Sequence, residues 1–182
     1  CIDWAWQNGA DVISNSWGVS CSFSANVIDN AIDNARTQGR GGLGAVVVFA
    51  AGNGGIGCID FPANLPGVMA VGALDKFGNR TSYSSYGPAL DIMALGGETP
   101  GDIRTTDRMG TAGFHNSNYY RKYSGTSAAC AQVAGVAALL VSAEPDLTEA
   151  QVRCRLENTA TDIGQFGTCL LYTSDAADDA NC

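Results

Sequence analysis

The 182-residue sequence has little basic charge, a single histidine and no long hydrophobic run. Ten Lys and Arg against 18 Asp and Glu give a net charge of −8, which argues against a nucleic-acid-binding protein. One histidine excludes a histidine-rich metal site. The longest apolar run, Ala128 to Val141, contains Gln132 and Gly135 and is too short to span a bilayer. We therefore expect neither a nucleic-acid partner nor a membrane partner.

Both ends of the chain are unusual for a globular domain. The sequence starts with CIDWAWQNGADV, which reads as the interior of a helix running into a strand, so we expect the chain to begin within a longer protein. No signal peptide is visible. Residues 169–179 read CLLYTSDAADD and resemble a translated sequencing adapter. We therefore expect residues 1–168 to be the native domain and residues 169–182 to be a non-native read-through tail.

Strands and helices alternate along residues 1–168. Apolar and β-rich runs predict strands at residues 10–16, 45–51, 68–74 and 90–94. A helix is predicted from Val27 to Ala35, because the apolar residues of this stretch fall on one face. Residues 127–142 are apolar almost all round, which indicates a buried central helix, and a last helix is predicted after the Thr148–Gln151 capping box. Residues 96–124 read as a hairpin with long surface loops. This order predicts an α/β fold, a doubly wound parallel sheet with helices on both faces.

Ser127 stands where a Gly-Thr turn opens an apolar helix, within YSGTSAACAQVAG (residues 123–135). The first turn of a helix leaves backbone N–H groups unpaired and carries the positive end of the helix dipole. That environment suits a nucleophile whose reaction intermediate carries an oxyanion. On this segment alone, Ser127 fits a nucleophile and a helix N-cap equally well.

Asn53 follows a predicted buried strand, within the glycine-rich segment FAAGNGG (residues 49–55). Ligands and catalytic groups collect at the carboxyl ends of parallel strands, and the Asn53 amide could donate a hydrogen bond there. The alternative is a turn asparagine in left-handed geometry.

In this order, the segments resemble the subtilisin-like serine proteases. GTSAACAQVAG resembles the serine box GTSMAxPHVAG of that family, AAGN resembles its oxyanion-asparagine turn, and NSWG (residues 15–18) resembles its substrate-binding strand. FPANLPGVMAVGALD, RTSYSSYGPALDIMA and PDLTEAQVRCRLENTAT extend the resemblance over residues 1–166. The resemblance implies a subtilisin-like fold that is incomplete at the N-terminus.

The resemblance also implies a reaction, peptide-bond hydrolysis through an acyl-enzyme. Ser127 is then the nucleophile, and the Asn53 side chain with the Ser127 backbone N–H holds the oxyanion. The implied substrate-binding residues are Ser16, Trp17 and Gly18, which pair with the substrate backbone, and Ala51 and Gly52, which line the pocket for the residue before the cut. Core packing is the alternative role for the Trp17 ring.

The sequence departs from the family pattern in its catalytic groups. The D-[ST]-G and H-G-T motifs, which carry the family's Asp and His, are absent and are expected before Cys1. His115 has no H-G-T around it and is expected to be an exposed loop residue. We therefore expect a serine endopeptidase by family whose fragment is inactive; the alternative is an inactive subtilase-like binding or scaffold domain. An α/β-hydrolase esterase fits poorly, because G-x-S-x-G and a later histidine are missing.

Further expectations concern cysteines, specificity and partners. Cys21 and Cys58 both follow predicted strand ends and could form a disulfide, whereas Cys130 should be free and packed. SWG, GRGGLG and GNGG resemble the kexin-like branch of the family, which cuts after basic residues. The only carboxylate near these segments in the sequence is Asp60. Asp60 could be a pocket group or a calcium ligand, and the alternative is a solvated loop residue. The resemblance implies that catalysis needs no cofactor; structural calcium is possible, but no ligands can be assigned. It also implies polypeptide substrates and a secreted protein, and it allows an N-terminal propeptide in the full-length protein.

Overall fold

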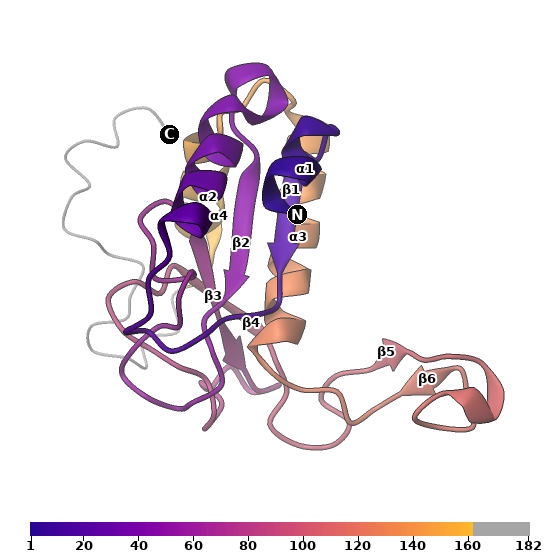
Figure 1. Ribbon diagram of the computed structural model, residues 1–182. Helices are drawn as coiled ribbons and strands as arrows, with labels where there is room; N and C mark the ends of the chain where they lie inside the picture. Colours follow the sequence, from indigo (N-terminus) through magenta and orange to yellow (C-terminus); the bar gives the residue numbers. More distant parts are fainter. Residues whose placement is uncertain (162–182) are drawn as a thin grey trace.

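The computed structural model describes residues 1–161, and a four-stranded parallel sheet forms its centre (Figure 1). The strands lie side by side in chain order, and every neighbouring pair is parallel. They are β1 Val12–Asn15, β2 Val46–Ala50, β3 Met69–Leu74 and β4 Ile92–Leu95. Each overlaps one of the four predicted strands. The predicted boundary at residue 168 and the predicted tail 169–182 lie outside the described residues.

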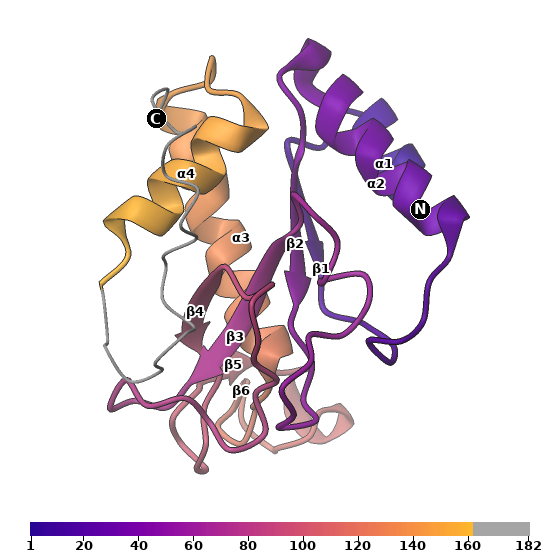
Figure 2. The same ribbon diagram turned by 90° about the vertical axis from the view of Figure 1, so that its left-hand side faces the viewer.

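Helices cover both faces of the sheet, as Figure 2 shows. They are α1 Ile2–Gln7, α2 Asn26–Gln38, α3 Thr126–Ala143 and α4 Glu149–Thr159, with short 3-10 helices at Gly39–Gly42 and Gly110–Ala112. α1 and α2 lie on one face; α3 packs across all four strands on the other, with α4 beside it. The α/β class and the parallel sheet with helices on both faces are thereby confirmed.

The connections between strands are less regular than the predicted alternation. Only β1 and β2 are joined through a helix, which is α2. β2 leads to β3, and β3 to β4, through loops 51–68 and 75–91, which contain no helix. A parallel connection needs a dozen or more residues to return along the sheet, and loops of this length can do so. Both loops start at the carboxyl ends of strands, where the candidate site lies.

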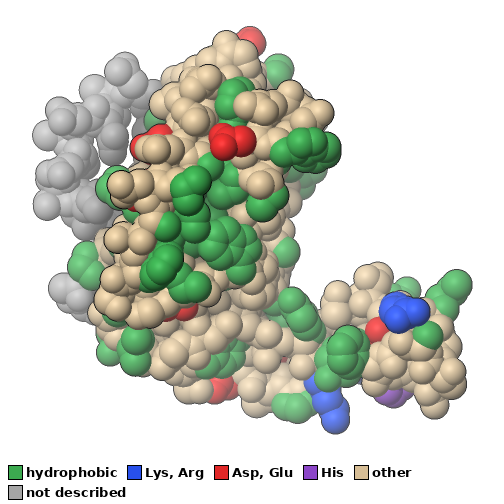
Figure 3. Space-filling view, viewed as in Figure 1, with side chains coloured by type: hydrophobic (Ala, Val, Ile, Leu, Met, Phe, Trp, Pro, Cys, Tyr) green, Lys and Arg blue, Asp and Glu red, His purple; other side chains and the backbone are tan. Residues whose placement is uncertain are grey.

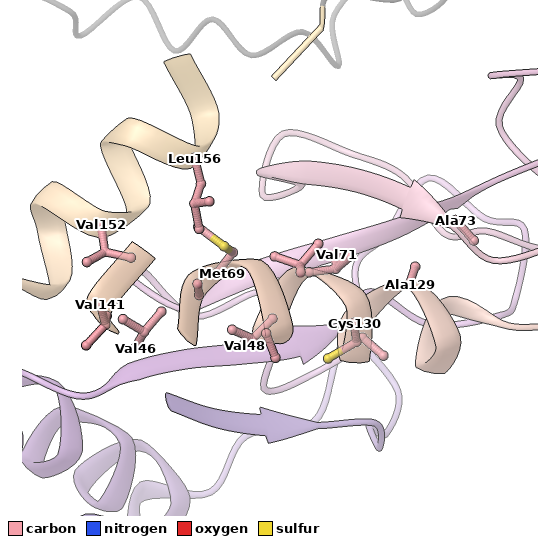
Figure 4. Close-up of a cluster of buried hydrophobic side chains, with 14 of the residues drawn as sticks. Val46, Val48, Met69, Val71, Ala73, Ala129, Cys130, Val141, Val152 and Leu156 are labelled. Atoms are coloured by element: carbon pink, nitrogen blue, oxygen red, sulfur yellow. The ribbon is translucent and has the colours of Figure 1, made fainter. Parts of the chain in front are cut away.

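The side chains of β2 alternate between two hydrophobic cores. Val46 and Val48 face α3, as Figure 4 shows, while Val47 and Phe49 face the α2 side. All four are fully buried. Burial of a side chain of this size stabilises a fold by about 1.5–3 kcal/mol. The unbroken apolar run that predicted a strand buried on both faces is explained by this double packing.

α3 packs on the sheet with one side only, so the prediction of a buried central helix is confirmed for that side and wrong for the other. Ala129 and Cys130 lie against the sheet, but Val136 and Leu139 are 53% and 72% exposed. The helix has 18 residues and, by length and composition alone, could cross a membrane; its contacts with all four strands make it a core helix of this fold. An apolar run without periodicity does not reveal which side meets the sheet.

A narrow hairpin projects from the body of the molecule just before α3 (Figure 1). Its strands, β5 Thr105–Thr106 and β6 Tyr119–Tyr120, are antiparallel. The hairpin carries His115, the only histidine of the chain, on its exposed surface (Figure 3). The predicted hairpin within residues 96–124 is confirmed, as is the position of His115 in an exposed loop.

Candidate active site

Ser127 lies in the first turn of α3, next to the end of β1. The helix starts at Thr126 after Gly125, whose φ of 126° no ordinary side chain adopts readily. The Ser127 hydroxyl donates to the Ser16 carbonyl oxygen at 3.4 Å, and the Ser16 hydroxyl donates to the Ser127 carbonyl oxygen at 3.1 Å. Ser127 and the predicted substrate-binding segment are therefore neighbours, although 111 positions separate them in sequence.

Asn53 is fixed against the residue that precedes Ser127. Its Oδ1 accepts hydrogen bonds from the Thr126 backbone N–H at 2.9 Å and from the Thr126 hydroxyl at 3.0 Å. Thr126 is fully buried, whereas Asn53 is exposed. Within residues 1–161 no acceptor pairs with the Asn53 Nδ2 group. The Asn53 side chain is thus held through its oxygen. Its two amide N–H donors remain available for a ligand beside the first turn of α3.

After β1 the backbone leaves the sheet, and it is unpaired at Trp17 and Gly18. Within the part of the chain that the structure describes, the backbone groups of Trp17 and Gly18 form no hydrogen bond. A free extended edge of this kind can accept a peptide as an added strand. The Trp17 ring packs edge-on against Phe49 at 5.1 Å between centroids, yet 42% of the residue remains exposed. One side of the Trp17 ring therefore packs on the core, and substrate contact by its exposed side stays a prediction.

Residues 18–19 lie against residues 60–61 of the loop after β2. Val19 and Phe61 form an antiparallel bridge, with N–H to O distances of 2.8 and 3.0 Å. A disulfide joins Cys21 to Cys58, with 6.1 Å between the Cα atoms, which confirms the pairing considered from sequence. Two segments from different strand ends are therefore tied together beside Ser127.

Asp60 lies between the two predicted pocket walls. Its backbone N–H donates to the Ala51 carbonyl oxygen at 3.0 Å, and its side chain borders both Gly18 and Gly52. Burial raises the pKa of the Asp60 carboxyl above its ordinary value. No hydrogen bond or ion pair reaches that carboxylate from any residue between 1 and 161. Ser85, which sequence reasoning missed, lies close by, and its buried hydroxyl has no hydrogen-bond partner in the part of the chain that the structure describes.

Other candidate groups do not join this cluster. His115 is on the projecting hairpin, where its Nδ1 pairs with the Ser117 hydroxyl at 3.0 Å. Cys130 is free and buried, as expected, and burial raises the pKa of its thiol. No group of three His, Cys, Asp or Glu side chains that could hold a metal ion occurs in residues 1–161. The described site thus contains a hydroxyl, an amide and a carboxylate, without an imidazole.

Known proteins are similar to this chain in sequence and in fold. Subtilisin DY of Bacillus licheniformis is 39% identical over 183 residues, and alkaline elastase YaB of a Bacillus strain is 36% identical over 173 residues. Among solved structures, the prenylagaramide maturation protease PagA has a TM-score of 0.73 at 29% identity, with 93% of this chain and 61% of that chain covered. A Pseudoalteromonas arctica protease has a TM-score of 0.73 at 32% identity, with 93% of this chain and 53% of that chain covered.

The relatives are longer than this chain. The match to Subtilisin DY covers 97% of the chain and 60% of the relative, and the match to alkaline elastase YaB covers 93% and 41%. The family model matches residues 1–173, which include every element described above. With that match, the shared fold and the 39% identity to a subtilisin, the chain belongs to the subtilase family.

Proposed function

We propose that the protein containing this chain is a serine endopeptidase, with Ser127 as nucleophile and Asn53 as oxyanion donor. The observation that carries the proposal is the anchoring of Asn53 by Thr126, directly before Ser127. A donor that is already oriented stabilises developing negative charge without reorganisation during the reaction. The Ser127 backbone N–H, in the first turn of α3, supplies the second donor.

In the proposed mechanism, the Ser127 hydroxyl attacks the scissile carbonyl carbon while a general base takes its proton. The carbonyl oxygen becomes the oxyanion, and the acyl-enzyme forms when the amine leaves with a proton from the same base. We assign that base to a histidine, oriented by an aspartate, before Cys1, because the family order is Asp, His, Ser. We do not assign the role to His115, which lies on the projecting hairpin and pairs there with Ser117. The reaction requires no cofactor.

The proposed substrate is an extended polypeptide. It would add a strand along residues 16–18, where the backbone groups of Trp17 and Gly18 are unpaired, and place its residue before the cut between that strand and residues 51–52. We also propose that the protein acts outside the cell, since the Cys21–Cys58 disulfide suits an oxidising compartment. Both points extend to this chain what its subtilisin relatives suggest.

The first test is to sequence the source DNA upstream of Cys1 and to express the complete reading frame. We expect D-[ST]-G and H-G-T motifs in frame, and a product that hydrolyses casein. Ser127→Ala should abolish this activity, and Asn53→Ala should lower kcat by about 10²–10³-fold, the usual loss for one oxyanion donor. Asp146→Asn, at an exposed residue without partners among those described, is the matched control and should leave kcat unchanged.

A catalytically inactive subtilase-like binding domain is the competing function. It predicts a complete reading frame that lacks the Asp or the His, and a product without peptidase activity. Both functions predict that the 182-residue chain has no activity on its own. Turnover of casein by this chain, lost in Ser127→Ala, would contradict the assignment of the base to the upstream part.

A further inference from the structure

The projecting hairpin is basic, although the chain as a whole is acidic. Residues 103–124, which form the hairpin and its base, contain four of the ten Lys and Arg residues and one of the 18 Asp and Glu residues. Their net charge is therefore +3, whereas all other residues together carry −11. The Lys and Arg side chains visible in Figure 3 lie on the hairpin and where it joins the body. A local positive field of this kind attracts negatively charged partners.

The basic side chains of the hairpin are exposed and unpaired. Within residues 1–161, no hydrogen bond or ion pair involves the side chains of Arg104, Arg108, Arg121 and Lys122. Arg104 only stacks on the Tyr119 ring, with 4.1 Å between the guanidinium carbon and the ring centroid. The other basic residues all have polar partners; they are Arg36, Arg40, Lys76, Arg80, Arg153 and Arg155. The unpaired cations of the described chain are thus confined to the hairpin.

Apolar side chains lie beside these cations. Met109, Phe114 and Tyr119 are 78%, 86% and 46% exposed. The Phe114 ring packs against that of Tyr120, with 5.5 Å between centroids, so most of its surface faces solvent from a fixed position. Exposed Met, aromatic and Arg side chains are together typical of protein–protein interfaces. This composition favours a partner that brings apolar side chains as well as negative charge.

A groove of about 780 Å³ is lined entirely by residues 105–124. Its lining combines the Phe114 ring with the side chains of Arg108 and Lys122. Asp107 also lines the groove, but its carboxylate accepts hydrogen bonds from the backbone N–H groups of Arg108 and His115, each at 2.8 Å. The acidic group is therefore engaged within the hairpin, whereas the two basic side chains are available to a ligand.

We propose that the hairpin of residues 103–124 is a docking surface for an acidic polypeptide segment that carries both carboxylates and apolar side chains. The carboxylates pair with Arg108 and Lys122, and the apolar side chains pack on the rings of Phe114 and Tyr119. The inference goes beyond the proposed peptidase function, because this binding requires no group of the candidate active site. An inactive chain binds the segment in the same way.

A long polyanion is a poorer occupant of the hairpin. A nucleic acid or a sulfated polysaccharide extends beyond the groove and meets the rest of the chain, whose negative charge repels it. A sulfated polysaccharide also lacks apolar side chains to cover Phe114. A short acidic segment of a protein contacts the hairpin alone and supplies both kinds of group.

Fluorescence anisotropy with the 182-residue chain tests the docking surface without requiring catalysis. The probe is a short fluorescein-labelled peptide in which Glu and Leu alternate, and its counterpart has Gln in place of each Glu. We expect the Glu peptide to bind at least about tenfold more tightly, a difference of about 1.4 kcal/mol. Its affinity should fall as the salt concentration rises, because the contacts are exposed.

Single variants locate the binding on the hairpin. Arg108→Gln and Lys122→Gln should each weaken binding of the Glu peptide about twofold to fivefold, the range for exposed ion pairs. Arg155→Gln is the matched control, since it removes the same charge from α4 and should leave the affinity unchanged. Phe114→Ser should weaken binding about threefold, whereas Phe77→Ser, which removes a 76% exposed ring outside the hairpin, should not. Near-ultraviolet circular dichroism and thermal unfolding confirm that each variant is folded.

The same titrations include the outcomes that overturn the proposal. These are equal affinity for the two peptides, no binding of either peptide by the folded chain, or a loss in Arg155→Gln as large as in the hairpin variants. Heparin or duplex DNA that binds more tightly than the Glu peptide, without any loss in Phe114→Ser, would assign the hairpin to a polyanion instead. Ser127→Ala should bind like the unchanged chain, so failure of docking and failure of the peptidase function are separate results.

Discussion

At the scale of single residues, the turn that carries Asn53 depends on Gly55. This glycine has a φ of 63°, and a Cβ atom there would lie 2.6 Å from the Ser82 carbonyl oxygen. We expect Gly55→Ala to combine left-handed strain of about 1–2 kcal/mol with about 1–3 kcal/mol from crowding the backbone. Urea denaturation measures the change in the free energy of unfolding.

Gly41→Ala is the matched control for this prediction. Gly41 has a φ of 68°, and its Cβ position has nothing within 4 Å. The substitution should therefore cost only the left-handed strain. Equal losses for the two variants would show that the contact with Ser82 does not constrain the Asn53 turn.

Single residues of the site differ in how well the sequence predicts them. Ser127 and Asn53 were identified because each stands in a short local motif. Their link through the Thr126 backbone and hydroxyl was not predicted, because it joins two segments 73 positions apart. Ser85 was missed for a similar reason. Its hydroxyl is buried without a hydrogen-bond partner among residues 1–161, a state that no sequence pattern records.

At the scale of elements, the loops after β1 and β2 depend on their disulfide. Cys21 and Cys58 are 37 positions apart, so the bond restricts a long stretch of the unfolded chain. We expect the double variant Cys21→Ser, Cys58→Ser to lose about 2–4 kcal/mol of unfolding free energy. Cys1→Ser, which removes an exposed free thiol, should lose nothing measurable in the same urea titration. Unchanged stability of the double variant would mean that the Val19–Phe61 bridge alone holds these loops.

The elements themselves were predicted where burial leaves a periodic or uniform pattern. β2 is apolar throughout because both of its faces are covered, and the amphipathic pattern of α2 matches its buried Ile32 and Ala35. Val27, expected on that face, is 77% exposed in the first turn of the helix. Loops 51–68 and 75–91 have no such pattern, so the absence of helices there could not be foreseen. Loop 51–68 carries Asn53 and the two predicted pocket residues Ala51 and Gly52.

At the scale of the whole molecule, one side of α3 remains unusually apolar. Val136 and Leu139 are exposed on a helix whose other side packs on the sheet, and β1 is an edge strand with no partner beyond it among residues 1–161. Exposed apolar patches and free strand edges favour association. We expect the purified 182-residue chain to self-associate with rising concentration. Val136→Gln with Leu139→Glu should shift its sedimentation towards the monomer.

Val27→Gln is the control that gives this prediction its specificity. Val27 is as exposed as Leu139 but lies on α2, on the opposite face of the sheet. If general surface hydrophobicity causes association, Val27→Gln will act like the α3 variant. If the outer side of α3 is the contact surface, only the α3 variant will dissociate, because one lone apolar side chain contributes little. A chain that stays monomeric at every concentration, measured by analytical ultracentrifugation, would show that this exposed side is tolerated in water.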